Sequence, residues 1–216
     1  GEKCSCLFLD LPAKRRKKAL TQKGSTMSRS LMKREVIEEA AIRLFSTKGL
    51  TRTTVKDIAA AAGVTEGVLY RHYEGKEEMA WKLFNRELDQ FIHLVSEVLF
   101  DNRLPFAQRF SLAIQTIYDY YVYNSDQFAF ILLTQHGFPE ERLVSRKSDP
   151  MDVTSRFIGQ GIGDGDIPPC DAELCAGLIM GAILQPLVLH RYGRLELEPS
   201  THLHVTEACM RILGAA

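Results

Sequence analysis

The chain has 216 residues, of which 45% are hydrophobic, and its 27 Lys and Arg balance its 27 Asp and Glu; this composition is that of a soluble globular protein, and we expect no apolar run long enough to cross a bilayer. The charges are unevenly distributed, because residues 1–76 hold 16 Lys/Arg and 8 Asp/Glu whereas residues 77–216 hold 11 and 19. A neutral total charge gives no reason to expect nucleic acid, but a basic N-terminal part on an acidic body favours DNA binding at one end only.

Residues 1–30 show no sustained periodicity, and we expect them to form a disordered extension. The run from Lys14 to Lys18 is entirely basic, and mostly small polar residues follow from Gly24 to Ser30. Two interpretations are open. The segment is an arm that follows the DNA backbone or enters the minor groove, or it is a solvated extension that includes translated sequence ahead of a start at Met27.

A first domain is predicted over residues 31–76, and it begins with a helix from about Met32 to Lys48. The helix has an apolar stripe at helical spacing, formed by Ile37, Ala40, Ala41, Leu44 and Phe45. Lys48 suits the negative end of a helix, and Gly49 suits the position that follows a helix end. We expect this helix to pack across the two helices that come next.

Residues 54–73, TVKDIAAAAGVTEGVLYRHY, predict two short helices joined by a tight turn. Thr54 and Asp57 have the spacing of a capping box at the start of the first helix. Gly63 permits a sharp turn that a residue with a β-carbon would resist, and Thr65 is a plausible cap for the second helix. This is a helix-turn-helix, which lays its second helix in the major groove of DNA.

The run TTVKDIAAAAGVTEGVLYRHYEGKEEM, residues 53–79, resembles the TetR family of bacterial transcriptional regulators. The rest of the chain resembles that family only in its length and its all-helical pattern. The resemblance implies phosphate contacts by Thr54, Tyr70, His72 and Lys76, and contacts to base edges by Thr65, Glu66, Gly67 and Arg71. Tyr73 is expected to pack inside.

Two of these side chains have a second interpretation. Arg71 could pair with a guanine edge or grip a phosphate. Glu66 could accept a hydrogen bond from a cytosine amine or only favour the positive end of the helix dipole.

A second domain is predicted over residues 77–216, which gives an all-α fold in total. Its helices are expected at about 77–100, 105–124, 127–136, 149–162, 171–192 and 200–213. The first of them runs from the helix-turn-helix into the body, and the resemblance makes it the mechanical link between the two. Gly159, Gly161, Gly163 and Gly165 weaken the fourth helix. With no preceding strand and no Lys they do not form a nucleotide-binding loop, so a flexible helix end and loop is expected there.

Apolar and aromatic side chains on the helices at 105–124, 125–136 and 149–162 could close over a mostly apolar ligand cavity. The candidate lining residues are Phe110, Ile114, Ile117, Tyr121, Phe128, His136 and Met180. Each of them could equally be ordinary core, and the expectation of a pocket comes from the family resemblance. A ligand bound there would shift the long helix and weaken DNA binding by its differential affinity for the two states.

The segment from Asp171 to Tyr192 is apolar almost all round, which predicts burial on more than one side. Gly177 and Gly181 are four residues apart and would let another helix approach closely. This helix and the last one either close the monomer core or form half of a four-helix bundle with a second copy, and the resemblance implies the dimer. The candidate interface residues are Gly177, Gly181, Leu184, Val188, Val205 and Cys209.

The sequence contains no pattern that requires catalysis. HExxH, GxSxG and Walker motifs are absent, and His202 and His204 would point apart on a helix, so we expect no enzyme, cofactor or metal site. The Cys4–Cys6 pair is more typical of a solvated tail than of a metal site. With five cysteines and no secretory signal, reduced thiols and a cytoplasmic location are expected.

Together with the family resemblance, these observations predict a homodimeric repressor that binds a near-palindromic double-stranded operator and leaves it when a small hydrophobic effector binds. The alternative is a DNA-binding regulator without a small-molecule effector, controlled by a protein partner.

Overall fold

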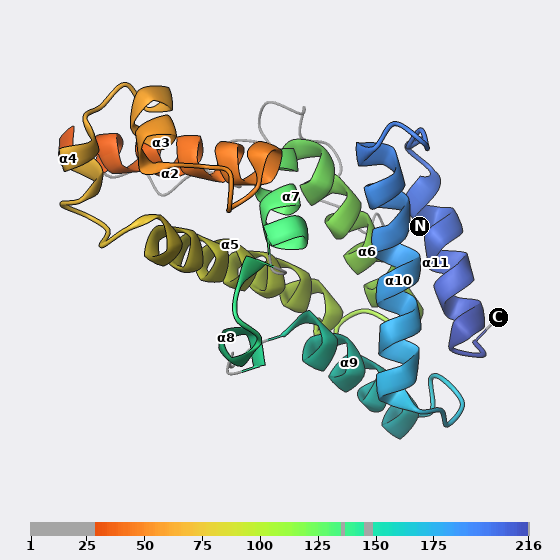
Figure 1. Ribbon diagram of the computed structural model, residues 1–216. Coiled ribbons are helices and arrows are strands. Elements are labelled where there is room, and N and C mark those ends of the chain that lie inside the picture. The colour runs from red at the N-terminus through yellow and green to blue at the C-terminus, as the bar shows by residue number, and fades with distance from the viewer. Residues whose placement is uncertain (1–28, 135–136, 145–148, 216) are drawn as a thin grey trace. The chain divides into compact units, whose positions relative to one another are not determined.

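The computed structural model describes residues 29–134, 137–144 and 149–215. Helices α2 to α11 make up the regular structure of these residues, and no strand occurs among them, which confirms the predicted all-α fold (Figure 1). Residues 37–216 form one compact unit. Because that unit runs through residue 76, the division into domains at 31–76 and 77–216 stays a prediction. The basic segment 1–28 lies outside the described residues.

The three N-terminal helices are α2 (Arg29–Lys48), α3 (Val55–Ala61) and α4 (Glu66–Leu69). The predicted capping box at the start of α3 is present, since the Thr54 side chain accepts from the Asp57 amide and the Asp57 carboxylate accepts from the Thr54 amide. The chain leaves α2 at Gly49 with φ +82° and leaves α3 at Gly63 with φ +64°. Both are left-handed conformations that favour glycine, so the predicted turns are confirmed.

Helix α4 is shorter than the sequence suggested. It ends at Leu69, although the amide of Tyr73 still donates to the Leu69 carbonyl at 2.9 Å in the turn that follows. Gly67 and the β-branched Val68 have low helix propensity in so short a segment. Thr65 stands at the cap position but makes no side-chain cap hydrogen bond, so the predicted Thr65 side-chain cap is wrong.

The other helices form the body of the molecule. They are α5 (Lys76–Leu99), α6 (Phe106–Tyr123), α7 (Ser125–Thr134), α8 (Glu140–Val144), α9 (Pro150–Asp164), α10 (Ala172–Arg191) and α11 (Thr201–Ile212). Helix α5 packs against α6, α7 and α9, and α10 packs against α6, α9 and α11. In Figure 1, α5 runs from the helix-turn-helix into this body, as expected for a connecting helix.

Helix α9 confirms the helix expected over 149–162 and continues where a flexible helix end and loop were expected. Its start is fixed by Asp149, whose side chain accepts from the Met151 amide, and the helix continues to Asp164 before Gly165 ends it with φ +79°. Gly161 is buried where α9 meets α6, and a Cβ at this position would lie only 2.5 Å from the Phe106 ring. At least this glycine therefore serves close packing.

Helix α10 buries one face and exposes another. Ile179 and Leu187 are fully buried, whereas Leu174 is 61% and Leu178 is 52% exposed, so burial on more than one side does not occur within this chain. Helix α10 is long and apolar enough to cross a membrane, by length and composition alone. The sequence had led us to expect no apolar run of that length. Core helices of globular proteins share these properties, and the buried face of α10 is covered by α6, α9 and α11.

Candidate functional site: recognition surface, apolar cavity and helix face

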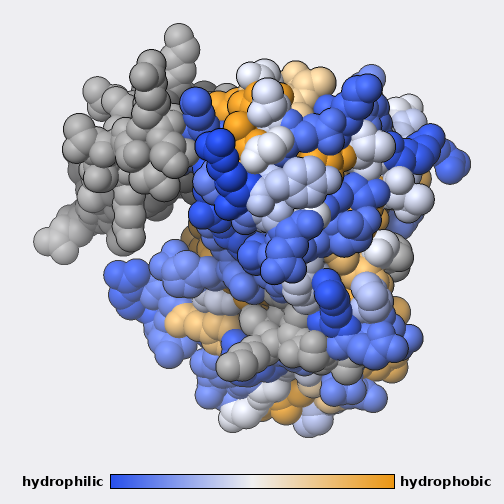
Figure 2. Space-filling view, turned by 60° about the vertical axis from the view of Figure 1, so that its left-hand side comes forward, coloured by the Kyte–Doolittle hydropathy of each residue, from blue (hydrophilic) through white to orange (hydrophobic). Residues whose placement is uncertain are grey.

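The residues predicted to touch DNA lie on one exposed stretch, residues 65–76, which we call the recognition surface, and at the start of α3. Tyr70 is 56% exposed, and four more of these residues are exposed beside it: Thr65, Glu66, Gly67 and Arg71. His72 and Lys76 are half-buried. Figure 2 turns this side of the molecule forward and shows mainly hydrophilic residues there. A polar, exposed helix end of this kind suits a charged partner.

Two of the predicted phosphate contacts already have partners. The Thr54 hydroxyl donates to Asp57 Oδ2 at 2.9 Å and accepts from the Asp57 amide at 3.1 Å. Lys76 Nζ lies 3.5 Å from the Thr51 carbonyl oxygen and 3.5 Å from Glu77 Oε1. A phosphate at these positions would compete with Asp57 for the Thr54 proton and with Glu77 for the Lys76 ammonium. The Thr54 amide and hydroxyl, with Lys48, also hold the pKa of Asp57 below its usual value.

A buried set of charged and hydroxyl groups supports the recognition surface from behind. This junction cluster consists of Glu38, Tyr73, Arg86 and Glu87. The Tyr73 hydroxyl donates to Glu38 Oε1, and Arg86 donates through Nη1 to Glu38 and through Nη2 to Glu87 Oε1, the latter at 2.7 Å. Burial lowers the pKa of Arg86, but the bonds to the two carboxylates raise it overall. Tyr73 is therefore inside, as predicted, and it ties the end of the recognition surface to α2 and α5.

The junction cluster was missed by sequence reasoning. Its members are separated by up to 49 positions along the chain, so no local pattern connects them. The available signal was Glu38 itself, a carboxylate next to Ile37 and three positions before Ala41 in the apolar stripe, where it is 5% exposed. A buried carboxylate requires a partner.

A second connection joins the end of α2 to the body. Arg191 Nη2 on α10 donates to the Ser46 carbonyl at 3.0 Å, and the Ser46 hydroxyl donates to Asp126 Oδ1 on α7 at 3.4 Å. The Phe45 ring stacks on Phe130 of α7, with centroids 5.8 Å apart. The helix-turn-helix therefore contacts α7 and α10 as well as α5.

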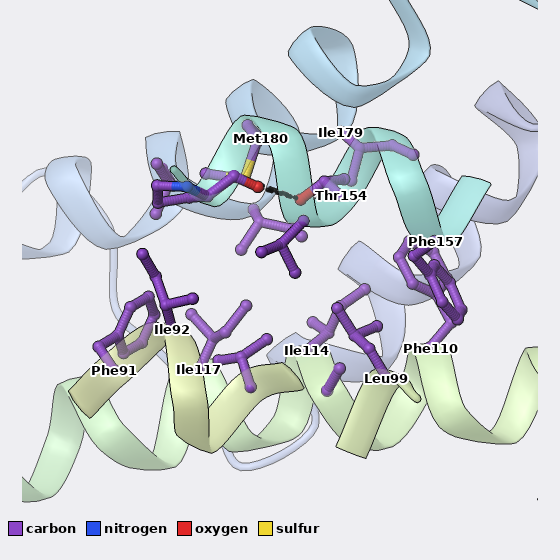
Figure 3. Close-up of a pocket in the computed structure, with 16 residues that line it drawn as sticks. Phe91, Ile92, Leu99, Phe110, Ile114, Ile117, Thr154, Phe157, Ile179 and Met180 are labelled. Atoms are coloured by element: carbon purple, nitrogen blue, oxygen red, sulfur yellow. Dashed lines mark hydrogen bonds between the residues drawn. The ribbon is translucent and has the colours of Figure 1, made fainter. Parts of the chain in front are cut away.

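An apolar cavity lies between α5, α6, α9 and α10 (Figure 3). The space open to the centre of a water molecule is about 50 Å³. Its wall is made of aliphatic and aromatic side chains, except for the polar hydroxyl of Thr154 and the polarisable sulfur of Met180. The Thr154 hydroxyl donates to the Pro150 carbonyl at 2.8 Å, so it is already satisfied within α9. None of the described residues in the wall carries a charged side chain, which suits an apolar ligand.

The structure brings four of the seven predicted lining residues to this cavity, namely Phe110, Ile114, Ile117 and Met180. Tyr121 and Phe128 do not line it; their rings pack against each other at 5.3 Å, and the Tyr121 hydroxyl lies 2.7 Å from His190 Nδ1. His136 lies outside the described residues. Sequence reasoning placed the helix over 149–162, now α9, at the cavity but named none of its residues, and it missed α5 altogether. Phe157 from α9 and Phe91, Ile92 and Leu99 from α5 line the cavity.

The predicted dimer residues divide by burial. Gly177 and Gly181 are exposed, and nothing in the described chain lies within 4 Å of where a Gly181 Cβ would be. Leu184 and Val188 are half-buried. Val205 and Cys209 are 7% and 0% exposed in the single chain, so neither is presented to a second copy, and we withdraw them as interface residues.

The exposed apolar residues on α10 and α11 are instead Leu174, Leu178 and Leu203, which is 53% exposed. Together with Gly177 and Gly181 they form what we call the helix face. The choice between the two sides of α11 depends on how the helix is rotated against α6, which its sequence alone does not determine.

Known proteins resemble the N-terminal part of this chain, and some resemble most of its length. Residues 37–81, which include the recognition surface, match the family model described as "Bacterial regulatory proteins, tetR family". The HTH-type transcriptional repressor KstR2 of Mycolicibacterium smegmatis is 26% identical over 157 residues, covering 69% of this chain and 75% of that protein. These relatives regulate transcription, which agrees with the expectation that the chain is not an enzyme.

Solved structures share the fold. A bacterial regulatory protein in the tetR family from Rhodococcus RHA1 superposes with a TM-score of 0.74 at 20% identity, covering 88% of this chain and 100% of its own. AibR, solved in complex with isovaleryl coenzyme A and operator DNA, has a TM-score of 0.65 at 22% identity, covering 85% and 98%.

Proposed function

We propose that this chain, which belongs to the TetR family of bacterial transcriptional regulators, is a cytoplasmic homodimeric repressor that a small and largely hydrophobic ligand releases from its operator. The observation that carries the proposal is the recognition surface, an exposed polar stretch on a helix-turn-helix whose first helix has a complete capping box. Under this proposal, residues 31–76 are the DNA-binding domain and residues 77–216 are the domain for effector and partner.

Within the recognition surface, the side chains divide into two roles. Tyr70, His72 and Lys76, with Thr54 from α3, contact phosphates and fix the register on the duplex. Thr65, whose hydroxyl is not used as a cap, joins Glu66, Gly67 and Arg71 in facing the bases. Arg71 is exposed, so it is able to reach a guanine edge or a phosphate.

The helix face is the dimer interface in this proposal. Its exposed leucines and glycines would be buried by a second copy, and no neighbour of Gly181 among the described residues explains the absence of a side chain there. A two-fold dimer presents its two recognition surfaces to half-sites of a near-palindromic operator, roughly 34–36 Å apart for one turn of DNA.

The cavity supplies the response to a ligand. It lies against α5, and α5 also carries Arg86 and Glu87 of the junction cluster that holds the recognition surface. A ligand that binds more tightly when α5 is displaced weakens operator binding by that difference in affinity. AibR, a protein of the same fold, was solved with both isovaleryl coenzyme A and operator DNA, which supports a fold that takes a small ligand as well as DNA.

The test is binding of the purified full chain to fragments of its own promoter region, with a panel of hydrophobic compounds added. We expect sequence-specific binding that one class of compound relieves. We also expect Tyr70→Ala to weaken specific binding at least about 100-fold, because each of two subunits loses a hydrogen bond to a charged phosphate worth about 1.5 kcal/mol or more. Binding would be followed by fluorescence anisotropy at two salt concentrations.

The matched control is Tyr192→Ala, which removes an equally exposed tyrosine (65% against 56%) from another part of the chain. Operator affinity retained by Tyr70→Ala would remove Tyr70 from the contact surface. Specific binding that no compound relieves would keep the DNA function and favour control by a protein partner instead.

A further inference from the structure

The C-terminal end of α2 is bound by an arginine from a distant part of the chain. The last carbonyls of a helix have no partner within the helix itself. At the end of α2 the Phe45 carbonyl accepts from the Gly49 amide at 3.1 Å, whereas the Ser46 carbonyl accepts from Arg191 Nη2 at 3.0 Å. The guanidinium of Arg191, the last residue of α10, therefore lies at the negative end of the α2 dipole, where a positive charge is favourable.

The contact made by Arg191 fixes an orientation in a region that is already closely packed. Ser46 is 6% exposed, and the Phe45 ring beside it stacks on Phe130 of α7. Apolar stacking holds two helices close together without fixing a direction, whereas a hydrogen bond requires alignment of its donor and acceptor. Arg191 therefore adds a directional bond to a contact that the two phenylalanines make.

Helix α2 is held at two points by two different helices. Glu38 accepts from Arg86 of α5 in the junction cluster. Ser46 accepts from Arg191 of α10. The two points are eight positions apart along α2, which is about 12 Å in a helix. A helix held at one point can turn about it, whereas a helix held at two points has a fixed direction. The direction of α2 is therefore set by the relative position of α5 and α10.

The helix-turn-helix is attached to α2 at both of its ends. At its start, the buried Thr53 donates through its hydroxyl to the Leu44 carbonyl of α2 at 3.3 Å. At its end, the Tyr73 hydroxyl donates to Glu38 of α2. A change in the direction of α2 therefore changes the direction of the recognition surface.

Helix α10 connects the Arg191 contact with the helix face. It runs continuously from Ala172 to Arg191, although Pro186 lies within it. Gly181 of the helix face and Arg191 are ten positions apart, which is about 15 Å along a helix. In a two-fold dimer built on the helix face, the distance between the two recognition surfaces depends on how each α2 is set against its α10.

We propose that Arg191 is a positioning residue for operator binding, which fixes α2 to the helix of the dimer interface and so determines the half-site spacing that the dimer accepts. This inference rests on the proposed function, because it requires a dimer that binds two half-sites. Arg191 itself is half-buried between α10 and α2 and is not among the proposed DNA contacts.

The same arrangement connects the cavity with the recognition surface. In Figure 3, Ile179 and Met180 of α10 stand on the opposite side of the cavity from Leu99 of α5. A ligand that moves α5 away from α10 turns α2, since each of these helices holds one of its two points. The bond from Arg191 to Ser46 is what makes α2 respond to α10 as well as to α5.

The experiment measures how strictly the dimer selects a half-site spacing. The probes are the promoter fragment that the full chain binds specifically and the same fragment with one base pair inserted between its half-sites. The insertion moves one half-site by about 3.4 Å and rotates it by about a tenth of a turn of DNA. We expect the wild type to bind the longer fragment at least about tenfold more weakly, the effect of losing one charged hydrogen bond to a phosphate.

Arg191→Met removes the guanidinium and keeps an apolar side chain. We expect it to reduce the penalty for the inserted base pair to about threefold or less, because α2 is then able to turn toward the displaced half-site. Arg191→Gln, whose side chain is too short to reach the Ser46 carbonyl, should do the same. The matched control is Arg211→Met, since Arg211 pairs with Glu207 on its own helix α11, and it should keep the wild-type penalty.

The ratio of the two affinities separates positioning from stability. A purely structural role of Arg191 would lower the fraction of active protein, which weakens binding to both fragments by the same factor and leaves the ratio unchanged. A wild-type penalty retained in folded Arg191→Met, or a variant that is monomeric by sedimentation velocity, would overturn the proposal. If Arg191→Met does not fold, Arg191→Gln decides between the two roles.

Failure of this inference is distinguishable from failure of the proposed function. Specific binding by the wild type that is unaffected by the insertion would overturn the role of Arg191 and keep the DNA function. A wild type without sequence-specific binding would overturn the proposed function and this inference with it.

Discussion

The recognition surface and the helix face are both exposed in the single chain, but they differ in chemistry. The recognition surface offers a phenol, an imidazole, a guanidinium and an ammonium, and Tyr70 and Arg71 stand out from it. The helix face offers Leu174, Leu178 and Leu203 beside two glycines. The first suits a wet, charged partner such as DNA, and the second suits a dry, apolar partner such as a second copy.

The support behind each surface differs in the same way. The recognition surface is held from behind by the ionic junction cluster, with Glu38 and Glu87 buried around Arg86. The helix face is backed by Ile179 and Leu187, which are fully buried. Apolar packing is non-directional, whereas hydrogen-bonded charges fix orientation, so the ionic support suits the surface that has to keep a register on DNA.

Gly181→Glu tests the helix face and should have the largest effect. A carboxylate buried between two copies without a counter-ion costs several kcal/mol, so we expect the dissociation constant of the dimer to rise at least about 100-fold. Sedimentation velocity over a range of protein concentrations would measure it. Operator binding should fall with the dimer.

The matched control is Gly159→Glu on α9, since that glycine is also exposed and helical with open space around it. It should leave the dimer unchanged. A dimer that persists in Gly181→Glu would mean that the dimer interface does not include the helix face.

Arg86→Met tests the support of the recognition surface and should have an intermediate effect. It leaves the buried carboxylates of Glu38 and Glu87 without their guanidinium. Breaking a buried ion pair costs about 3–5 kcal/mol, and we expect a loss near 3 because the Arg86 side chain is 39% exposed. Urea unfolding would measure the loss.

Tyr73→Phe tests whether the junction cluster orients the recognition surface or only stabilises the fold. It removes only the hydroxyl that donates to Glu38, with a cost of about 1.5–3 kcal/mol for a hydrogen bond to a charged group. We expect operator affinity to fall although Tyr73 is 5% exposed and is not among the proposed DNA contacts. Unchanged affinity in a folded variant would make the cluster a stability feature alone.

The parts of this molecule that sequence reasoning predicted well are those determined by neighbours in the chain. Thr54 and Asp57 are three residues apart, and the turn at Gly63 follows from a backbone conformation that the residue itself permits. The parts it missed depend on distant packing. Gly161 is explained only by Phe106 of another helix, and Cys209 is buried only because of how α11 lies against α6.

The cavity shows the same difference between features set by neighbours in the chain and features set by distant packing. Helical periodicity predicted an apolar face on α6 and a largely apolar α10, and the family resemblance implied a pocket, so Ile114 and Met180 could be proposed as lining residues. Which of the apolar residues surround empty space and which fill it depends on the positions of four helices.

Asp57→Asn tests the capping box in front of the recognition surface and should have the smallest effect. The pKa of Asp57 is lowered in the folded chain from its ordinary value of 3.8, first by the Thr54 amide and then by the Thr54 hydroxyl and Lys48. A carboxylate with a lowered folded pKa contributes stability that is present above the unfolded pKa and is lost as the pH falls through the folded one. Wild type and variant should therefore differ slightly at neutral pH and converge below about pH 3.8.

Thermal unfolding at several pH values would measure that convergence, with Asp166→Asn as the control, since Asp166 is an exposed aspartate outside the helix-turn-helix. A difference that stays constant down to acid pH would mean that the charge of Asp57 is not involved and that only its hydrogen bond to the Thr54 amide counts. A difference that vanishes in acid would show that the ion is what α3 requires, because only the carboxylate responds both to the helix dipole and to Lys48. In that case the capping box would act through its charge, as the junction cluster does, which is expected for a surface that binds DNA.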